Sequence, residues 1–179
     1  MKIFKIRLIM KNSIKAILVI LIAGSLITLV SCDSGKKYQK EENEQIQVYL
    51  AQRPGQNYQL KESGLYFLDS IPGTGIMPIT HDTAYIMYTA KFIDGTIYDS
   101  NILQNSTDTL IRPVNEGWLI AGVDEGITYM RVGGRATFLV PSKLAYGSDG
   151  APPYINGYQP LVFDIRLVRV KRGPGISNY

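Results

Sequence analysis

The chain has 179 residues, of which 45% are hydrophobic, so it is long enough for one folded domain with short appendages. Its 19 basic and 15 acidic residues give a formal net charge of +4. Five of the basic residues and none of the acidic ones lie in residues 1–32, so the rest carries 14 basic and 15 acidic residues, a net charge of −1. This near-neutral balance predicts no nucleic-acid binding, which needs a basic surface.

The chain has one cysteine, Cys32, and one histidine, His81. These counts exclude an intramolecular disulfide and a zinc site built from cysteine and histidine ligands. The sequence contains no complete nucleotide-binding or nucleophile motif either. We therefore expect neither a metal nor a cofactor.

The first 32 residues have the pattern of a targeting segment. A basic start precedes the uncharged and mostly apolar run 16–30, which is shorter than the roughly 20 residues of a membrane-spanning helix. Such a run is typical of the apolar part of a signal peptide. Met10 is a second candidate start besides Met1, because a short basic segment also follows it.

The apolar run ends in Leu29-Val30-Ser31-Cys32, which resembles a bacterial lipobox. In a lipobox the cysteine is lipidated and becomes the first mature residue. The resemblance implies a signal peptide over 1–31, a membrane anchor on Cys32 and a place in the cell envelope, periplasmic or surface-facing. The alternative is a single-pass anchor with an incidental cysteine.

Residues 32–62 are predicted to hold the lipidated cysteine, a flexible polar linker over 33–40 and a short helix over 41–53. Apolar Ile46, Tyr49 and Leu50 recur at helical spacing, and Pro54-Gly55 ends the helix. This helix either docks on the domain or forms a solvated spacer, and the sequence leaves both readings open.

From residue 63 onward the pattern changes to strands. In Leu161–Val170 the apolar residues alternate with polar ones, as in a strand with one buried face. Asp94-Gly95 is a strong hairpin signal. The only helical pattern lies at 120–130. The predicted fold is α+β, a twisted antiparallel sheet on one short α-helix. The domain is expected over 63–172, followed by a tail over 173–179. Strands are expected at 65–68, 84–92, 96–99, 135–140 and 161–170.

Seven short motifs in this domain occur in the order and with the spacing of FKBP-type peptidyl-prolyl cis-trans isomerases, the macrolide-binding immunophilins. The sequence therefore resembles that family over about residues 63–171, and its lipoprotein members in particular. The motifs are Pro72-Gly73-Thr74-Gly75, Tyr88-Thr89, 94–100 (DGTIYDS), Gly122 with Glu125-Gly126, 132–136 (VGGRA), Leu144-Ala145-Tyr146-Gly147 and Leu161-Val162-Phe163-Asp164.

The resemblance implies a proline-binding pocket. The Tyr146 hydroxyl and the Ile120 backbone N–H would donate hydrogen bonds to ligand carbonyls, and Asp99 would lie at the rim near the twisted amide. The residues implied in catalysis are Tyr88, Tyr98, Asp99, Ile120, Tyr146 and Phe163, and those implied in substrate binding are Leu110, Leu119, Val123, Tyr154 and Ile155.

The chain departs from the family pattern at the pocket floor, where Val123 stands in place of the usual tryptophan. Trp118, the only tryptophan, lies five residues too early to replace it. The resemblance implies proline-containing polypeptides as partners and a macrolide as a further ligand, whose affinity the change at Val123 puts in question. The lipid anchor would add the membrane as a partner.

Three functions are compatible with these patterns. The first is an isomerase that assists the folding of exported proteins. The second is an FKBP-fold binding or chaperone module with weak or no catalysis, and the third is a structural envelope lipoprotein. Taken alone, Phe163 would be an ordinary core residue and Asp99 a turn residue. Residues 80–82 and the pair Lys171-Arg172 are predicted to be solvated surface.

Overall fold

The computed structural model describes residues 35–102 and 108–174. The predicted signal peptide and Cys32 therefore lie outside the described residues, as do 175–179. The chain divides into two units, Met1–Lys40 and Glu41–Tyr179. In the first unit residues 35–40 are helical, so a flexible linker is the wrong expectation there. Lysine, glutamine and tyrosine all tolerate a helix, and the one poor helix former in this stretch, Gly35, is its first residue. No helix among the described residues is long and apolar enough to cross a membrane.

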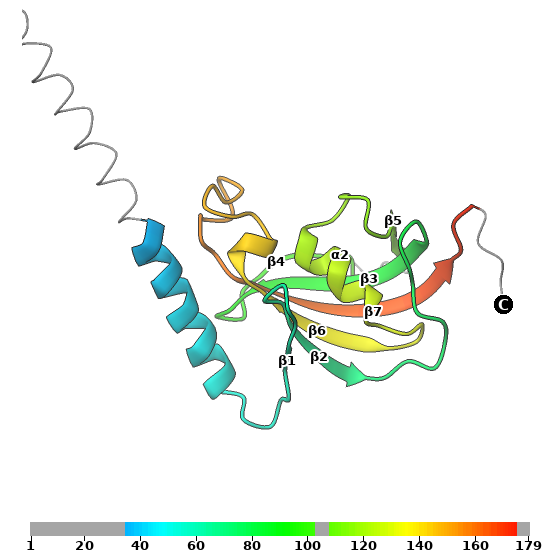
Figure 1. Ribbon diagram of the computed structural model, residues 1–179, viewed down its shortest axis with the longest axis horizontal. Coiled ribbons are helices and arrows are strands. Elements are labelled where there is room, and N and C mark those ends of the chain that lie inside the picture. The colour runs from blue at the N-terminus through cyan, green and yellow to red at the C-terminus, as the bar shows by residue number, and fades with distance from the viewer. Residues whose placement is uncertain (1–34, 103–107, 175–179) are drawn as a thin grey trace, which may run out of the picture. The chain divides into compact units, whose positions relative to one another are not determined.

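The second unit is built on one antiparallel sheet with α2 lying across one face, as Figure 1 shows. The strand order is β1-β2-β6-β7-β3-β4, and β5 also pairs with β3. The predicted α+β fold is confirmed. In chain order the elements are β1 (Gln59–Leu60), β2 (Tyr66–Ile71), β3 (Thr83–Phe92), β4 (Ile97–Ser100), β5 (Leu110–Pro113), α2 (Ala121–Thr128), β6 (Arg135–Val140), a 3₁₀ turn (Ser142–Leu144) and β7 (Leu161–Lys171).

The predicted strands are all present, with ends that differ by three residues at most. Two strands were not predicted. β1 has only two residues, both exposed. In β5, Leu110 is half-buried and Ile111 is exposed, and Pro113 closes the strand, so no alternating pattern marks it.

The main core lies between α2 and the inner face of the sheet. Phe138 of β6 is fully buried and stacks on Phe67 of β2, with ring centroids 5.5 Å apart. Gly126 of α2 lies directly against the Phe138 ring. The helix can approach the sheet this closely because glycine has no Cβ.

The N-terminal helix, whose part in the second unit spans residues 41–51, covers one end of the outer face of the sheet. Ile46 and Tyr49 are buried against Leu139 of β6 and Val162 of β7. Burying an apolar side chain of this size contributes about 1.5–3 kcal/mol. Of the two readings, the docked helix is confirmed and the solvated spacer is wrong.

The prediction of a solvated surface at Asp82 and Arg172 is wrong. Asp82 is 0% exposed, and its carboxylate accepts hydrogen bonds from Arg172 and from the backbone N–H groups of Ile79 and Gly173. The neighbouring His81 is exposed as expected, and its ring pairs with Glu116 at 2.9 Å. A carboxylate and a guanidinium far apart in sequence thus tie the start of β3 to the end of β7.

Candidate active site

A cavity of about 390 Å³ opens between α2 and the inner face of the sheet. Its walls come from strands β3, β4, β5 and β7, from the helix, from the loop before the helix and from the segment after the 3₁₀ turn. The lining residues are Ile86, Tyr88, Asp99, Leu110, Gly117, Trp118, Leu119, Ile120, Val123, Tyr146, Phe163 and Ile165.

Eight of the eleven predicted site residues line this one cavity, and three do not. Tyr98 packs beside it against Phe92, with ring centroids 4.9 Å apart. Tyr154 is 79% exposed on the loop after the 3₁₀ turn, while Ile155 is buried in the core. Tyr154 and Ile155 therefore lie outside the cavity, and their part in substrate binding stays a prediction.

The floor of the cavity is apolar. Phe163 and Ile165 point inward from β7, and Val123 faces them from α2; all three are buried. Alternation along β7 places these two residues on the inner face, as the sequence predicted. Because valine occupies the helix position, no aromatic ring closes the floor from that side.

Tyr88 and Asp99 form the polar edge of the cavity on the hairpin of β3 and β4. The Tyr88 hydroxyl donates a hydrogen bond of 2.7 Å to the Asp99 carboxylate. Burial, together with this carboxylate, raises the pKa of Tyr88 to about 12. Tyr88 is therefore a neutral donor at physiological pH, and it fixes the direction in which the carboxylate of Asp99 points.

Tyr98 carries the one buried side-chain oxygen without a hydrogen-bond partner among the described residues. Burial raises the pKa of this hydroxyl, and the nearby Tyr146 and Asp99 raise it further. An unpaired buried hydroxyl costs about 1–3 kcal/mol. A ligand carbonyl that reached this hydroxyl would remove that cost.

Trp118 lines the cavity from its rim and was missed as a site residue by the sequence analysis. The buried Asp124 of α2 accepts hydrogen bonds from the backbone N–H groups of Asn115 (2.9 Å) and Gly117 (3.3 Å). Asn115 adopts a positive φ of 58°, which turns the chain sharply. The loop thereby presents Trp118, 66% exposed, at the cavity mouth.

Two groups at the cavity are the predicted donors to ligand carbonyls. Ile120 caps α2, and none of the described residues accepts a hydrogen bond from its backbone N–H. Tyr146 is 39% exposed and follows the 3₁₀ turn Ser142–Leu144. The site thus combines an apolar floor with two donors, and the described residues hold no cluster of three metal-ligating side chains.

The segment that lines the cavity matches a known protein family. Residues 76–168, which include every lining residue, match the family of FKBP-type peptidyl-prolyl cis-trans isomerases. Because the match covers more than half of the chain, this protein belongs to that family. The predicted resemblance is therefore confirmed.

Relatives in bacteria support the assignment. The chain is 36% identical to the probable FKBP-type peptidyl-prolyl cis-trans isomerase FkpA of Neisseria meningitidis over 108 residues, which cover 60% of this chain and 38% of the relative. It is 34% identical to the FKBP-type 22 kDa peptidyl-prolyl cis-trans isomerase of Escherichia coli over 110 residues, 61% of this chain and 51% of the relative. The chain thus spans about half or less of these relatives.

Solved structures show the same fold. A peptidyl-prolyl cis-trans isomerase from Pseudomonas syringae aligns with a TM-score of 0.65 at 25% identity, over 77% of this chain and 96% of its own. AtFKBP13 aligns with a TM-score of 0.59 at 28% identity, over 65% of this chain and 99% of its own.

Proposed function

We propose that this protein catalyses cis-trans isomerisation of X–Pro peptide bonds in polypeptides. The observation that carries the proposal is the single cavity that gathers Tyr88, Asp99, Ile120, Tyr146 and Phe163 from separate parts of the chain. Family membership agrees with it.

The reaction needs only an environment that stabilises the peptide bond while it rotates. Rotation about a peptide bond breaks amide resonance and meets a barrier of about 18–20 kcal/mol. An enzyme accelerates it by binding the twisted amide more tightly than the planar one. The twisted amide has less charge separation, so an apolar cavity favours it. No nucleophile or metal is required for this chemistry.

Each wall of the cavity has a part in this proposal. The proline ring would lie on the floor formed by Phe163, Val123 and Ile165. The Ile120 N–H and the Tyr146 hydroxyl would hold the carbonyls on either side and so fix the rotation axis. Asp99, oriented by Tyr88, would lie at the edge beside the twisted amide.

The cellular setting proposed is the bacterial cell envelope. Cys32 at the end of the apolar run would carry the lipid anchor, and the clients would be exported proteins that fold there. Labelling with a radioactive fatty acid tests the anchor: the native chain should incorporate label, and Cys32→Ser should not.

Peptide exchange measured by NMR tests the catalytic proposal. The protein should accelerate cis-trans exchange of a short X–Pro peptide, and both Phe163→Ala and Asp99→Ala should remove most of the acceleration. Asn43→Ala, a change on the exposed face of the N-terminal helix, is the matched control and should retain it. A folded native protein that leaves the uncatalysed rate unchanged would contradict the proposal.

A binding module with weak catalysis is the second candidate, and Val123 favours it. Valine leaves the floor without the aromatic ring that the family usually places there. Val123→Trp distinguishes the candidates. If native protein binds the peptide but accelerates exchange only after this substitution, the binding module is the better description. Native activity that changes little on substitution supports the enzyme.

A further inference from the structure

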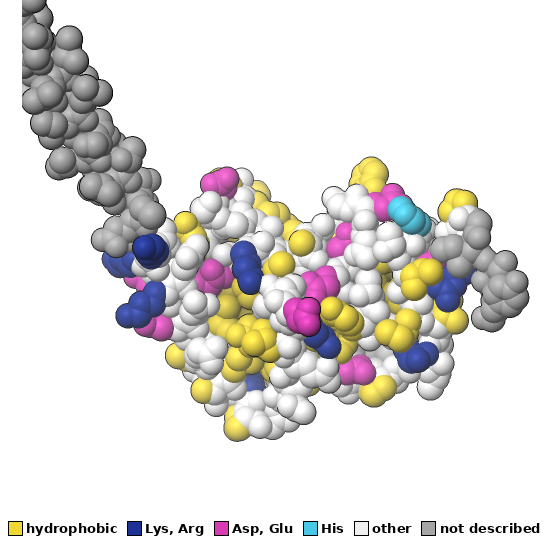
Figure 2. All heavy atoms as spheres, in the orientation of Figure 1, with side chains coloured by type: hydrophobic (Ala, Val, Ile, Leu, Met, Phe, Trp, Pro, Cys, Tyr) yellow, Lys and Arg dark blue, Asp and Glu magenta, His cyan; other side chains and the backbone are white. Residues whose placement is uncertain are grey.

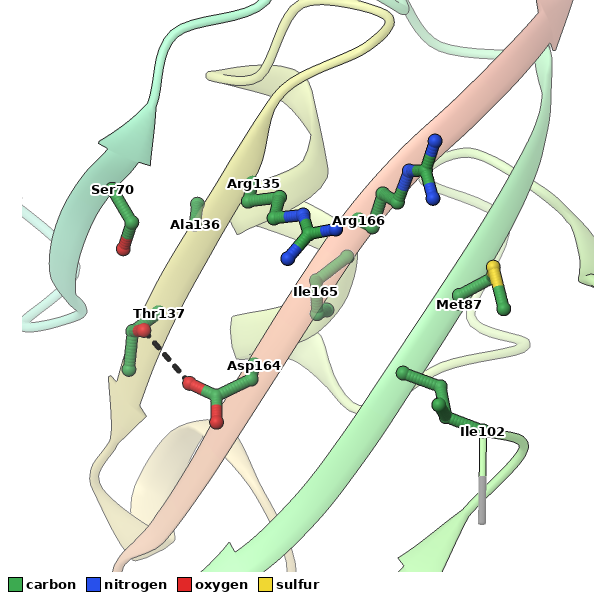
Figure 3. Close-up of a pocket in the computed structure, with 9 residues that line it drawn as sticks. All are labelled: Ser70, Met87, Ile102, Arg135, Ala136, Thr137, Asp164, Ile165 and Arg166. Atoms are coloured by element: carbon green, nitrogen blue, oxygen red, sulfur yellow. Dashed lines mark hydrogen bonds between the residues drawn. The ribbon is translucent and has the colours of Figure 1, made fainter. Parts of the chain in front are cut away.

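The outer face of the sheet carries a second hollow, on the side of β7 away from the active-site cavity. This groove has a volume of about 390 Å³ and lies over strands β2, β6, β7 and β3, where the N-terminal helix does not cover the sheet. Figure 3 shows its lining, which consists of Ser70, Met87, Ile102, Arg135, Ala136, Thr137, Asp164, Ile165 and Arg166.

Two arginines dominate the groove. Arg135 of β6 and Arg166 of β7 are direct partners across the antiparallel strands, and both side chains are exposed. Figure 3 shows their guanidinium groups on the same side of these two strands. Like charges placed directly opposite each other destabilise a sheet. The fold therefore tolerates a repulsion here that a bound anion would relieve.

No carboxylate of the described residues neutralises this pair. Asp164 is the acidic residue in the lining, and its oxygens are engaged elsewhere. One accepts a hydrogen bond of 2.7 Å from the Thr137 hydroxyl, drawn as a dashed line in Figure 3, and the other pairs with Lys91. Neither Arg135 nor Arg166 forms an ion pair with any described residue.

Apolar side chains flank the two charges. Met87 of β3 is the cross-strand partner of Arg166, and Ile102 is 42% exposed at the other wall. A guanidinium group binds a carboxylate through two parallel hydrogen bonds. A ligand that fits this groove therefore carries a carboxylate next to an apolar group.

We propose that the groove binds an extended, acidic segment of a polypeptide. A glutamate or aspartate of the segment pairs with Arg135 and Arg166, and a neighbouring apolar side chain lies on Met87. A nucleic acid fits less well, because the chain beyond residue 32 has a net charge of −1 and lacks the positive charge that holds a long polyanion. Charge complementarity thus favours a short acidic peptide.

The groove and the cavity can be occupied independently. Alternation along β7 directs Phe163 into the cavity and Asp164 and Arg166 to the opposite face. The proposal therefore does not rest on the catalytic one. A polypeptide held in the groove would leave the proline site free.

Calorimetry and amide shifts in NMR spectra test this proposal on the full chain in neutral detergent micelles. The probe is an acetylated and amidated hexapeptide of alternating leucine and glutamate, and the control peptide has glutamine in place of glutamate. We expect the glutamate peptide to shift amides of β6 and β7, and to bind more weakly as salt rises. The double variant Arg135→Gln/Arg166→Gln should lower its affinity about ten-fold or more, since charged hydrogen bonds are lost.

Arg169→Gln is the matched control. A register shift between Tyr85 and Ile86 pairs this arginine with Tyr85, on the same face of the sheet as Met87 and Arg166. It stacks on the Tyr85 ring at 3.8 Å and is not part of the groove. Its variant should bind the glutamate peptide with native affinity. Unchanged exchange catalysis in the double variant would show that its cavity is intact.

Four results would overturn the proposal. They are the absence of binding by the glutamate peptide, equal affinity for the glutamine peptide, and undiminished binding by the double variant. The fourth concerns the other possible occupants of the groove. If the native protein self-associates or binds micelles that contain phosphatidylglycerol, if the double variant does neither, and if the peptide has no effect, the groove serves a second copy or a lipid surface.

Discussion

The carboxylate of Glu42 on the N-terminal helix accepts two hydrogen bonds from Ser142, a residue 100 positions further along the chain. One comes from the Ser142 backbone N–H at 2.5 Å and the other from its hydroxyl at 2.7 Å. Both residues are buried. The Ser142 carbonyl in turn accepts hydrogen bonds from the N–H groups of Ala145 and Gly147, on either side of Tyr146. The N-terminal helix is thus attached to the segment that carries a site residue.

Replacing Glu42 by alanine should weaken both the fold and the site. The change leaves two buried donors of Ser142 without an acceptor, which costs about 2–6 kcal/mol of unfolding free energy at 1–3 kcal/mol for each group. Urea unfolding measures this loss. Because Tyr146 would be held less firmly, kcat/KM for an X–Pro peptide should also fall.

Asn43→Ala is the control for this prediction, because Asn43 is the next residue on the same helix and is exposed. It should change the unfolding free energy by less than about 0.5 kcal/mol. If the two variants unfold alike, the hydrogen bonds of Glu42 do not stabilise the segment.

Much of the sheet could be predicted because its strands alternate. Leu161, Phe163, Ile165 and Leu167 all lie on the inner face, as their spacing indicated. Val162 interrupts that pattern, and the structure gives the reason: the N-terminal helix covers it on the outer face. Whether an outward apolar residue is covered depends on contacts between distant segments, which local spacing does not contain.

The site could be predicted where it follows strand alternation or family motifs, and not where it depends on a loop. Trp118 is the clearest example. Its place at the rim depends on the hydrogen bonds that Asp124 accepts from Asn115 and Gly117, across a turn that the sequence analysis did not resolve. Trp118 lies five positions before Val123, too early in the chain to form the floor of the cavity, and in the structure it lies at the rim.

Because Trp118 is the only tryptophan, its fluorescence should report ligand binding directly. The side chain is 66% exposed, so a proline peptide or a macrolide that enters the cavity should exclude water and shift the emission to shorter wavelength. Phe163→Ala keeps the fluorophore but removes part of the floor, and its titration should show weaker binding. An emission spectrum that stays constant while NMR detects binding would contradict the rim position.

Gly126→Ala should destabilise the protein, although alanine normally favours a helix by about 0.5–1 kcal/mol over glycine. A Cβ on Gly126 would lie 2.5 Å from the Phe138 ring, which is fully buried and stacked on Phe67. Overpacking of this kind costs about 1–3 kcal/mol. Thermal unfolding should show a lower Tm. Gly55→Ala, where nothing lies within 4 Å of the added Cβ, should leave it nearly unchanged.

The pair Asp82–Arg172 should make stability depend on pH in the acidic range. Burial alone would raise the pKa of Asp82, but hydrogen bonds from Ile79, Gly173 and Arg172 outweigh it and hold the pKa below its ordinary value. A carboxyl whose pKa is lower in the folded state contributes stability above its unfolded pKa, about 3.9. That contribution is lost as the pH falls through the folded pKa.

Asp82→Asn tests this dependence. At pH 7 the variant should lose about 3–5 kcal/mol of unfolding free energy, because a partly buried Arg172 keeps its charge without a carboxylate to pair with. The gap between the two proteins should begin to narrow as the pH falls below the unfolded pKa of about 3.9, and it should be smallest below the folded pKa, where native Asp82 is protonated as well. Asp69→Asn, on the exposed part of β2, is the control and should change the unfolding free energy at pH 7 by less than about 0.5 kcal/mol. A gap that stays constant from pH 7 to pH 2 would mean that Asp82 stabilises the fold through its shape and not through its charge.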